Sequence, residues 1–189
     1  LDKFLLPNVW MPPLYAYYLY FFSFFDLEVH HNIQVILSSQ ILLSSLAVAF
    51  FYKINKLFFS EKISFYSSII FSLFPLYLYS CAQISSITLQ VFLTILFFYS
   101  LFKFNKNNNF YSILLLSFIS GLLILLRGEF ILLLLITFFY LFFYFKIKIK
   151  NILLIIIIIF LTICPYLIRN IIVLDAVTIT KSFGYNLWK

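Results

Sequence analysis

The stretch between Lys62 and Lys103 constrains the fold most, because it runs for forty residues without one charged side chain. A helix needs about 20 apolar residues to cross the hydrocarbon core of a bilayer, so this stretch is long enough for two crossings. A water-soluble domain carries roughly 25% charged residues, whereas this chain carries 10% and is 65% hydrophobic. The sequence therefore predicts an all-α polytopic membrane protein.

Uncharged runs divide the chain into about six expected membrane spans, which are 33–52, 63–81, 85–102, 110–126, 130–145 and 151–168. The second and third runs are separated near residues 81–85, where small and polar side chains gather. The fourth and fifth runs would form a helix of about 54 Å if joined, far longer than the ~30 Å hydrocarbon core. We therefore expect a hairpin that turns at residues 127–129.

The distribution of basic residues predicts which connections face the cytoplasm. The connections at 53–62, 103–109 and 146–150 hold eight lysines, whereas the intervening connections hold one basic residue, Arg127. Basic residues concentrate in cytoplasmic loops, so the lysine-bearing connections belong inside. The chain is then a multi-pass protein of the cell (inner or plasma) membrane, with Arg127 and everything after Ile168 on the extracytoplasmic side.

The aromatic segment 12–25 is expected to be an outer interfacial helix. It has fourteen residues, which is short for a span, and it opens with two prolines that suit a helix start. A shortened span is the alternative, but it would reverse every later loop. The expected organisation is the end of a first outer loop at 1–32, a six-span bundle at 33–168 and the start of an outer segment at 169–189. Because the chain opens with Leu1, we expect it to be part of a longer protein.

Two arginines are the main candidates for substrate binding. Arg169 follows the last span in "CPYLIRN", and Arg127 lies in the expected hairpin turn, so both would be positive charges at the outer face. Their guanidinium groups suit an anionic lipid headgroup or a phosphate. Asn170 would hydrogen-bond the same headgroup or cap the exit of the chain, and Glu129 beside Arg127 is either a further contact or a local ion-pair partner. The alternative for Arg169 is that it snorkels and caps a helix C-terminus.

Other polar residues support weaker hypotheses. One expected outer loop contains two acids and two histidines, which we interpret as a solvated loop in preference to a metal site: Asp26, Glu28, His30 and His31. We therefore expect no metal ligands among these residues and no cofactor, and the sequence leaves the metal dependence of the activity open. A disulfide between Cys81 and Cys164 is an alternative to two buried thiols. The chain has only three glycines, Gly121, Gly128 and Gly184. Because glycine is so rare here, we expect each to be required by the backbone at its position. No phosphate loop or nucleophile elbow occurs, and nucleic-acid binding is unsupported.

Several segments together resemble a known family. These are, in order, "WMPPLYAYYLYFF", "NIQVILSSQILLSSLAVAFFYKINKLFFSEKI", "SLFPLYLYSCAQISSITLQVFLTIL", "ISGLLILLRGEFILLL" and "CPYLIRNIIVLDAVTITKSFGYNLWK". Their order is similar to that in glycosyltransferase family 39, the membrane mannosyltransferase and aminoarabinose-transferase-like group. The resemblance implies a GT-C helical bundle, a polyprenyl-phosphate-linked sugar donor, and an active site at the extracytoplasmic face that serves a lipid, glycan or protein acceptor. It also implies that the catalytic carboxylate lies upstream of Leu1.

The chain departs from the family pattern at two positions. Met11 stands where aminoarabinose-transferase relatives carry a lysine, and Ile87 stands where family members often carry a glutamate. These differences imply a different contact to the donor headgroup or a different acceptor. A transporter or flippase of lipid-linked or envelope components is the alternative function, and a non-catalytic membrane assembly subunit is another. A transporter would show an internal repeat and broken helices with polar residues near the bilayer centre.

Overall fold

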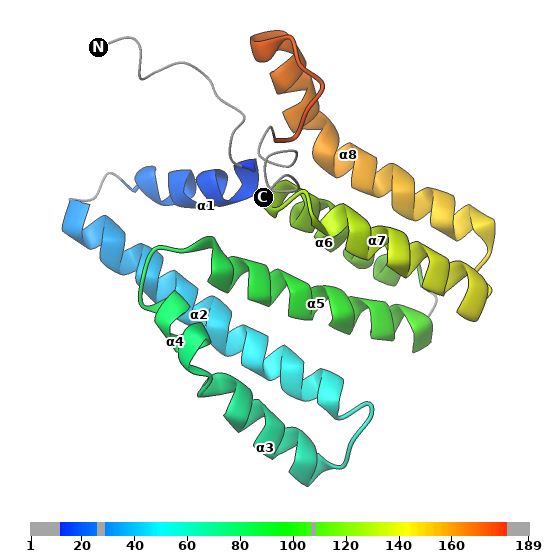
Figure 1. Ribbon diagram of the computed structural model, residues 1–189, viewed down its shortest axis with the longest axis horizontal. Helices are drawn as coiled ribbons and strands as arrows, with labels where there is room; N and C mark the ends of the chain where they lie inside the picture. Colours follow the sequence, from blue (N-terminus) through cyan, green and yellow to red (C-terminus); the bar gives the residue numbers. More distant parts are fainter. Residues whose placement is uncertain (1–11, 26–28, 107–108, 181–189) are drawn as a thin grey trace, which may run out of the picture. The chain divides into compact units, whose positions relative to one another are not determined.

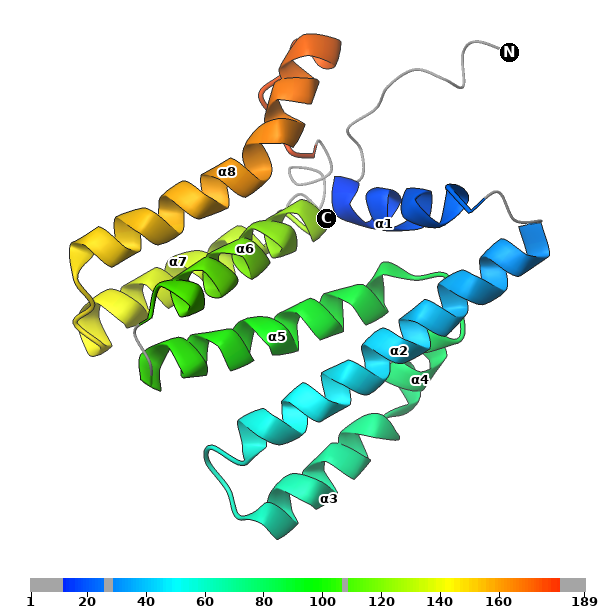
Figure 2. The ribbon, with the colours of Figure 1, turned by 180° about the vertical axis from the view of Figure 1, so that it is seen from behind.

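The structure is a computed structural model that describes residues 12–25, 29–106 and 109–180, and these residues are almost entirely helical (Figures 1 and 2). The elements are α1 (Pro13–Ser23), α2 (Val29–Asn55), α3 (Glu61–Ser72), α4 (Pro75–Cys81), α5 (Ser86–Lys106), α6 (Phe110–Leu126), α7 (Phe130–Phe139), the π-helical turn η2 (Tyr140–Tyr144) and α8 (Ile149–Leu174). The described part contains no strand, so the all-α prediction is confirmed.

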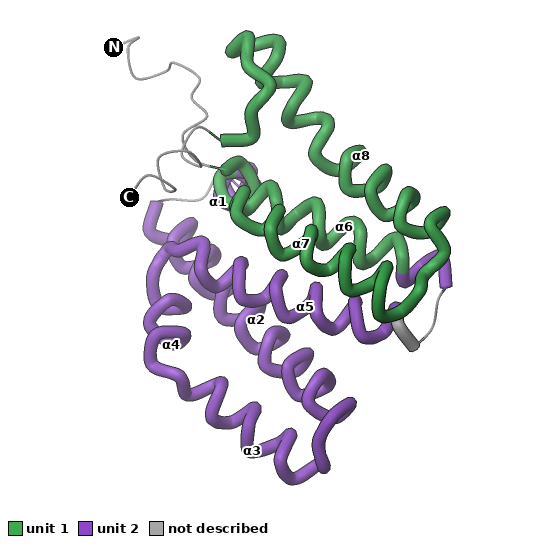
Figure 3. Tube along the Cα trace, turned by 45° about the vertical axis from the view of Figure 1, so that its right-hand side comes forward, with its two compact units in different colours: residues 1–16, 113–189 green, residues 17–112 purple. Residues whose placement is uncertain are grey.

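The chain forms two compact units, coloured separately in Figure 3. One comprises residues 17–112 and contains α2 to α5, and the other comprises residues 1–16 and 113–189 and contains most of α6 together with α7, η2 and α8. Large apolar side chains cover the outside of both units. Leu76 is 70% exposed in the first unit and Ile172 is 78% exposed in the second. Such surfaces are stable in lipid and unstable in water, as expected of membrane helices.

In the unit 17–112, α2 packs against α5 and α3, and α4 fills the space between α2 and α5. The core joins Ala47 of α2, Tyr77 and Cys81 of α4 and Ile95 of α5. Polar bonds fix the ends of these helices. Buried Gln40 donates from its Nε2 to the carbonyl of Ser85 at 3.0 Å, which ties α2 to the turn before α5. Gln40 therefore has a structural role inside this unit.

The segment 63–81, expected to be one span, contains two helices. The axes of α3 and α4 differ by 57° across the residues that separate them. Pro75 opens α4, and the residue before it, Phe74, is extended with φ −63° and ψ 119°. A proline disfavours the α conformation in the preceding residue and lacks the N–H that would continue the helix. The break at Phe74 and Pro75 follows from this one residue, and the single span expected at 63–81 stays a prediction for the bent pair α3–α4.

The aromatic segment forms α1, which begins at Pro13 as the two prolines predict. The hydroxyl groups of Tyr18 and Ser39 hydrogen-bond, so α1 is held to α2 within the unit 17–112. The interfacial position of α1 stays a prediction. His30 and His31 lie in the first turn of α2 with exposed side chains, so the expectation that they belong to a loop was wrong.

In the unit that contains α6, α7 and α8, Gly121 marks a close approach of α6 to α8. A Cβ atom at this glycine would lie 2.7 Å from the Cβ of Thr162 on α8. Only a glycine permits this contact, which confirms the expected backbone reason for Gly121. Nearer the α6–α7 turn, residues of α6, α7 and α8 line a small, open apolar pocket of about 110 Å³, among them Ile124, Leu134 and Ile159.

α6 begins and ends at the residues expected for the fourth span, whereas α2 and α8 extend beyond the expected spans, α8 by six residues past Ile168. Among the described residues three helices, α2, α5 and α8, are long and apolar enough to cross a membrane, and the bent pair α3–α4 would be a fourth span. The remaining two expected spans correspond to α6, with 17 residues, and to α7 continued by η2. The turn between α6 and α7 falls at 127–129 as predicted. The number of crossings stays a prediction.

Candidate functional site

The candidate site is built at the end of α8, where a proline interrupts a long apolar helix. Pro165 lies inside α8, and the helix bends in its C-terminal part (Figures 1 and 2). A proline removes one backbone hydrogen bond and clashes with the carbonyl four residues earlier, here that of Leu161. Twenty residues counted from Ile149 end at Ile168, so a ~30 Å hydrocarbon core crossed by α8 would end beside Arg169.

The side chain of Arg169 is half-buried and held in one orientation. Its Nη1 donates to Oδ1 of Asn170 at 2.9 Å. The guanidinium carbon also lies 5.9 Å from the centre of the Tyr166 ring, three residues earlier on the same face of the helix. A cation beside an aromatic ring gains roughly 0.5–1 kcal/mol at an exposed site. Of the five N–H donors of the guanidinium, the bond to Asn170 uses one, which leaves donors for an anion.

Asn170 connects Arg169 to the segment that follows α8. Its side chain is fully buried, accepts from Arg169 and donates from Nδ2 to the carbonyl of Thr178 at 2.7 Å. The structure thus shows the capping contact that the sequence suggested for Asn170. The contact of Asn170 with a headgroup stays a prediction, and its carboxamide is already committed to two bonds that position Arg169.

The chain after α8 turns back sharply, so that Thr178 reaches Asn170. Asp175 adopts the left-handed conformation with φ 53°, and its N–H donates to the carbonyl of Ile171 at 3.2 Å. The N–H of Ala176 reaches the carbonyl of Asn170 at 3.5 Å, which completes a helix-ending motif usually built on glycine. Aspartate tolerates this conformation better than most residues. The segment after α8 then runs back beside the last turns of the helix (Figure 1).

The second pair of predicted residues lies in the turn between α6 and α7. Arg127 is half-buried and its N–H continues α6 by donating to the carbonyl of Leu123 at 2.9 Å. Glu129 is exposed and precedes α7 without capping it through its side chain. Within the described ranges no ion pair joins Arg127 to Glu129, so the local pair expected from the sequence is not formed.

The two arginines lie at the same end of their unit without touching. α6 and α7 form a hairpin whose turn carries Arg127, and α8 runs back toward that end (Figures 1 and 2). No hydrogen bond among the described residues links Arg127 with Arg169 or Asn170. The structure therefore builds a supported site around Arg169 and places Arg127 at the same end as a separate cation.

The other predicted chemistry is not assembled in the described part. There, no three histidine, cysteine, aspartate or glutamate side chains come together as metal ligands. Cys81 is buried and Cys164 is partly buried, and both are free thiols. Met11, Asp26, Glu28 and Gly184 lie outside the described residues. Ile87, where relatives often have a glutamate, is an exposed side chain in the first turn of α5.

Two participants in the site were missed from the sequence. Tyr166 supports the guanidinium through its ring, and its spacing of three residues from Arg169 would have revealed it once a helix through Pro165 was accepted. Thr178 contributes only its carbonyl oxygen. That contact depends on the left-handed Asp175, which no local sequence pattern indicates.

Comparison with known protein families agrees with this architecture. The family model described as dolichyl-phosphate-mannose-protein mannosyltransferase matches residues 11–168, from the double proline to the last turns of α8 before Arg169. No curated protein and no solved structure matched the chain. The family match covers α1 to α7 and most of α8. The chain therefore belongs to the dolichyl-phosphate-mannose-protein mannosyltransferase family, and it is a membrane glycosyltransferase of the GT-C type.

Proposed function

We propose that the protein transfers a sugar from a polyprenyl-phosphate carrier to a lipid, glycan or protein acceptor at the extracytoplasmic face of the cell membrane. The family supports sugar transfer in general, and its description names a polyprenyl-type phosphate donor. The distribution of lysines supports the sidedness, because it assigns the ends of α6 and α8 to the outside.

In this reaction the acceptor hydroxyl oxygen attacks the anomeric carbon of the sugar. A new carbon–oxygen bond forms, the bond between the anomeric carbon and the phosphate oxygen breaks, and the phosphate leaves with the electron pair. A base takes the proton of the acceptor hydroxyl. The negative charge that grows on the leaving phosphate is stabilised by cations placed beforehand. The base is expected upstream of Leu1, as the family resemblance implies.

The observation that carries the proposal is the fixed guanidinium of Arg169. Its hydrogen bond to buried Asn170 and its position beside the Tyr166 ring orient the guanidinium group before any ligand binds. A group held in place needs no reorganisation as charge develops, and that is why such donors stabilise transition states. An arginine that only snorkels needs neither the bond to Asn170 nor the returning segment.

The broken helix α3–α4 is a feature that the transporter alternative also predicts. Pro75 explains this break locally, and Gln40 is occupied inside the helix bundle by the carbonyl of Ser85. Family membership favours sugar transfer over transport. We therefore retain glycosyl transfer as the function.

The test replaces Arg169 by lysine and by alanine in the full-length protein in membranes. Lysine keeps the charge and loses the planar fork, whereas alanine loses both. We expect turnover with a polyprenyl-phosphate sugar to fall partly for lysine and by about 10²-fold or more for alanine. Both variants are measured under saturating donor, so that the loss in kcat is separated from a change in KM.

The matched control is Ile172→Ala, which removes a side chain 78% exposed on the same end of α8. It should leave turnover unchanged. Abundance and melting temperature are measured for all three variants, because a residue needed only for insertion would lower these instead. Undiminished turnover of the alanine variant at normal abundance would contradict the proposed role of Arg169.

A further inference from the structure

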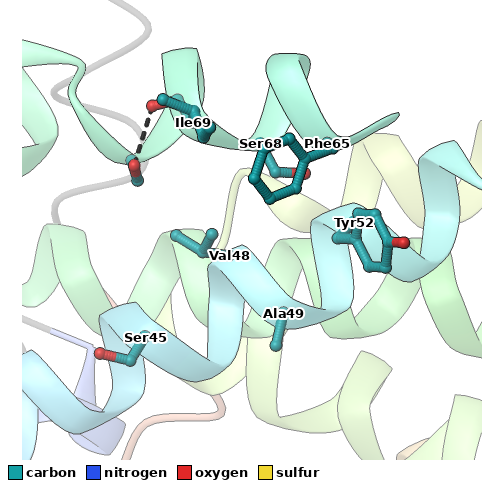
Figure 4. A pocket seen from close by; sticks show the side chains of 8 residues that line it. Ser45, Val48, Ala49, Tyr52, Phe65, Ser68 and Ile69 are labelled. Carbon is teal, nitrogen blue, oxygen red and sulfur yellow. Dashed lines mark hydrogen bonds between the residues drawn. The ribbon is translucent and has the colours of Figure 1, made fainter. Parts of the chain in front are cut away.

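An apolar groove lies between α2 and α3, far along the chain from the site on α8 (Figure 4). Its volume of about 510 Å³ is within the range of small-molecule pockets. Val48 points into the space from α2 and Phe65 points into it from α3 (Figure 4). The α2 wall runs from Ser45 to Tyr52, about 10 Å of helix.

The groove exists because its walls are built from small residues. Ser45 and Ala49 line the groove on α2 and Ser68 and Ser72 line it on α3, where larger side chains would narrow it. The serine hydroxyl groups are occupied within their own helices. Ser45 donates to Ile41, Ser68 to Ser64 and Ser72 to Ile69, at 3.0, 2.8 and 2.8 Å. The walls therefore offer no free donor to a polar ligand, and the groove suits a hydrocarbon chain.

One end of the groove opens at the α2–α3 turn, which is basic. On α2 the wall residues recur at intervals of three or four positions, and Lys56 follows the last of them, Tyr52, by four positions. On α3, Lys62 precedes the first wall residue, Phe65, by three positions. Both lysines therefore lie on the groove side of their helices, at the end nearer the turn. Lys56 forms an ion pair with Glu61, whose Oε1 accepts a hydrogen bond from the Lys56 Nζ at 3.2 Å. The hydroxyl of Tyr52 donates to the same carboxylate oxygen at 3.1 Å. The bond to Glu61 raises the pKa of Lys56, so that lysine stays charged and paired.

Two further lysines at this turn are not neutralised. Lys53 and Lys62 are exposed, and the one ion pair described at the turn joins Lys56 to Glu61. The Lys53 Nζ lies 5.2 Å from the centre of the Phe50 ring, and that ring packs against Tyr99 of α5, so the Lys53 ammonium group is turned toward α5. Lys62 is therefore the unpaired lysine that extends the α3 wall of the groove toward the turn. A basic cluster at the end of an apolar groove matches a molecule with an anionic head and an apolar tail. Each basic residue at a membrane surface raises the affinity for anionic lipids roughly fivefold.

We propose that the groove between α2 and α3 binds one anionic phospholipid of the leaflet that faces the α2–α3 turn. One acyl chain lies between Val48 and Phe65, and the phosphate is held by Lys62. This site is separate from Arg169 and does not depend on the proposed sugar transfer. Its occupant is a lipid because every wall residue is either apolar or internally hydrogen-bonded, and because the charge at its mouth is positive.

The experiment is native mass spectrometry of the full-length protein. The protein is mixed in detergent with equal amounts of phosphatidylglycerol and phosphatidylcholine that carry identical acyl chains, and the lipids that stay bound after the detergent is removed are counted. The unmodified protein should retain one phosphatidylglycerol in preference to phosphatidylcholine. Lys62→Gln should lower that preference about fivefold, and Lys53→Gln should lower it less. Lys103→Gln, an exposed lysine at the end of α5, is the matched control and should leave the preference unchanged.

Filling the groove tests the acyl chain independently. Ala49→Phe should abolish retention of the lipid, whereas Leu42→Phe, at a position 61% exposed on α2 outside the groove, should retain it. Equal retention by these two variants would overturn the proposal, and so would a headgroup preference insensitive to Lys62→Gln.

A third readout needs no variant. Phosphatidylglycerol with a diazirine in its acyl chain should label residues 45–52 and 65–72 of the unmodified protein more heavily than the exposed faces of the same helices. Labelling spread evenly over α2 and α3 would show ordinary contact with bulk lipid and would overturn the site. Absence of labelling in the groove, as when another helix of the full-length protein covers it, would overturn it as well.

Discussion

Replacing Gly121 by alanine should loosen the contact between α6 and α8, although the change adds only one methyl group. The new Cβ would lie 2.7 Å from Cβ, 2.8 Å from Cγ2 and 3.1 Å from Oγ1 of Thr162. Carbon atoms pack best at about 3.5–4.0 Å, so the helices must separate locally by roughly 1 Å. The nearest atom is a Cβ, and rotating the Thr162 side chain does not move it.

Thr162 is also poorly able to adapt in other ways. It is β-branched, and its hydroxyl donates to the carbonyl of Ile158 at 2.8 Å, which fixes its rotamer. Overpacking of this kind costs about 1–3 kcal/mol. Alanine gains about 0.5–1 kcal/mol over glycine inside a helix, so the expected net destabilisation is about 1–2 kcal/mol. Without the close contact, the same substitution would stabilise the protein.

The two explanations therefore predict opposite signs, which unfolding in mixed micelles can distinguish. We expect Gly121→Ala to lower the midpoint of unfolding by sodium dodecyl sulfate and to lower the melting temperature. A stabilised Gly121→Ala variant would refute the close approach of α6 and α8 at this point.

A double variant separates the contact from other effects of the alanine. Gly121→Ala combined with Thr162→Gly places the new methyl group in the space of the removed Cβ. The two substitutions should then cost less together than the sum of their separate costs, with a coupling of about 1 kcal/mol or more. Additive costs would mean that the two residues do not touch.

Two further predictions concern topology and the break before α4. For the topology, both native cysteines are replaced by serine and single cysteines are introduced at Asp175 and Lys148. In intact cells the cysteine at 175 should react with an impermeant maleimide and the cysteine at 148 should not. The reverse pattern would contradict the assignment of sides from the lysines. Replacing Pro75 by alanine should reduce the 57° bend between α3 and α4. Spin labels at Ile63 and Tyr79 would then lie farther apart by double electron–electron resonance, and an unchanged distance would show that tertiary packing imposes the bend.

The helix ends could be predicted from the sequence because charge and proline mark them. The double proline predicts the start of α1, and the lysines mark the turn after α2. Residues 127–129 separate two apolar runs too long to form one crossing, and the turn between α6 and α7 is found there.

Features inside the apolar runs were harder to predict. The break at Pro75 was missed because no charged residue marks it within the run 63–81, although the proline itself gave the necessary signal. The π-helical turn Tyr140–Tyr144 was not foreseen, since its aromatic residues show no pattern that separates it from an α-helix.

The charged residue of the candidate site could be predicted from the sequence, whereas the contacts that orient it could not. Arg169 was identifiable because it ends an apolar run of a chain with few charges. The bond from Asn170 to Thr178 spans eight residues and depends on the left-handed Asp175, so it required the structure.

The bend at Pro165 gives the enzyme a way to meet bilayers of different thickness. α8 has 26 residues, which is about 39 Å of helix against a hydrocarbon core of about 30 Å. A straight helix of that length must tilt as a whole to bury its apolar surface, and the tilt would change with every change of bilayer. If α8 flexes at Pro165, it can absorb the mismatch in its last turns alone. The depth of Arg169 then follows the headgroup layer, so that hydrophobic matching at one proline keeps the cation level with the phosphates of the lipids around it.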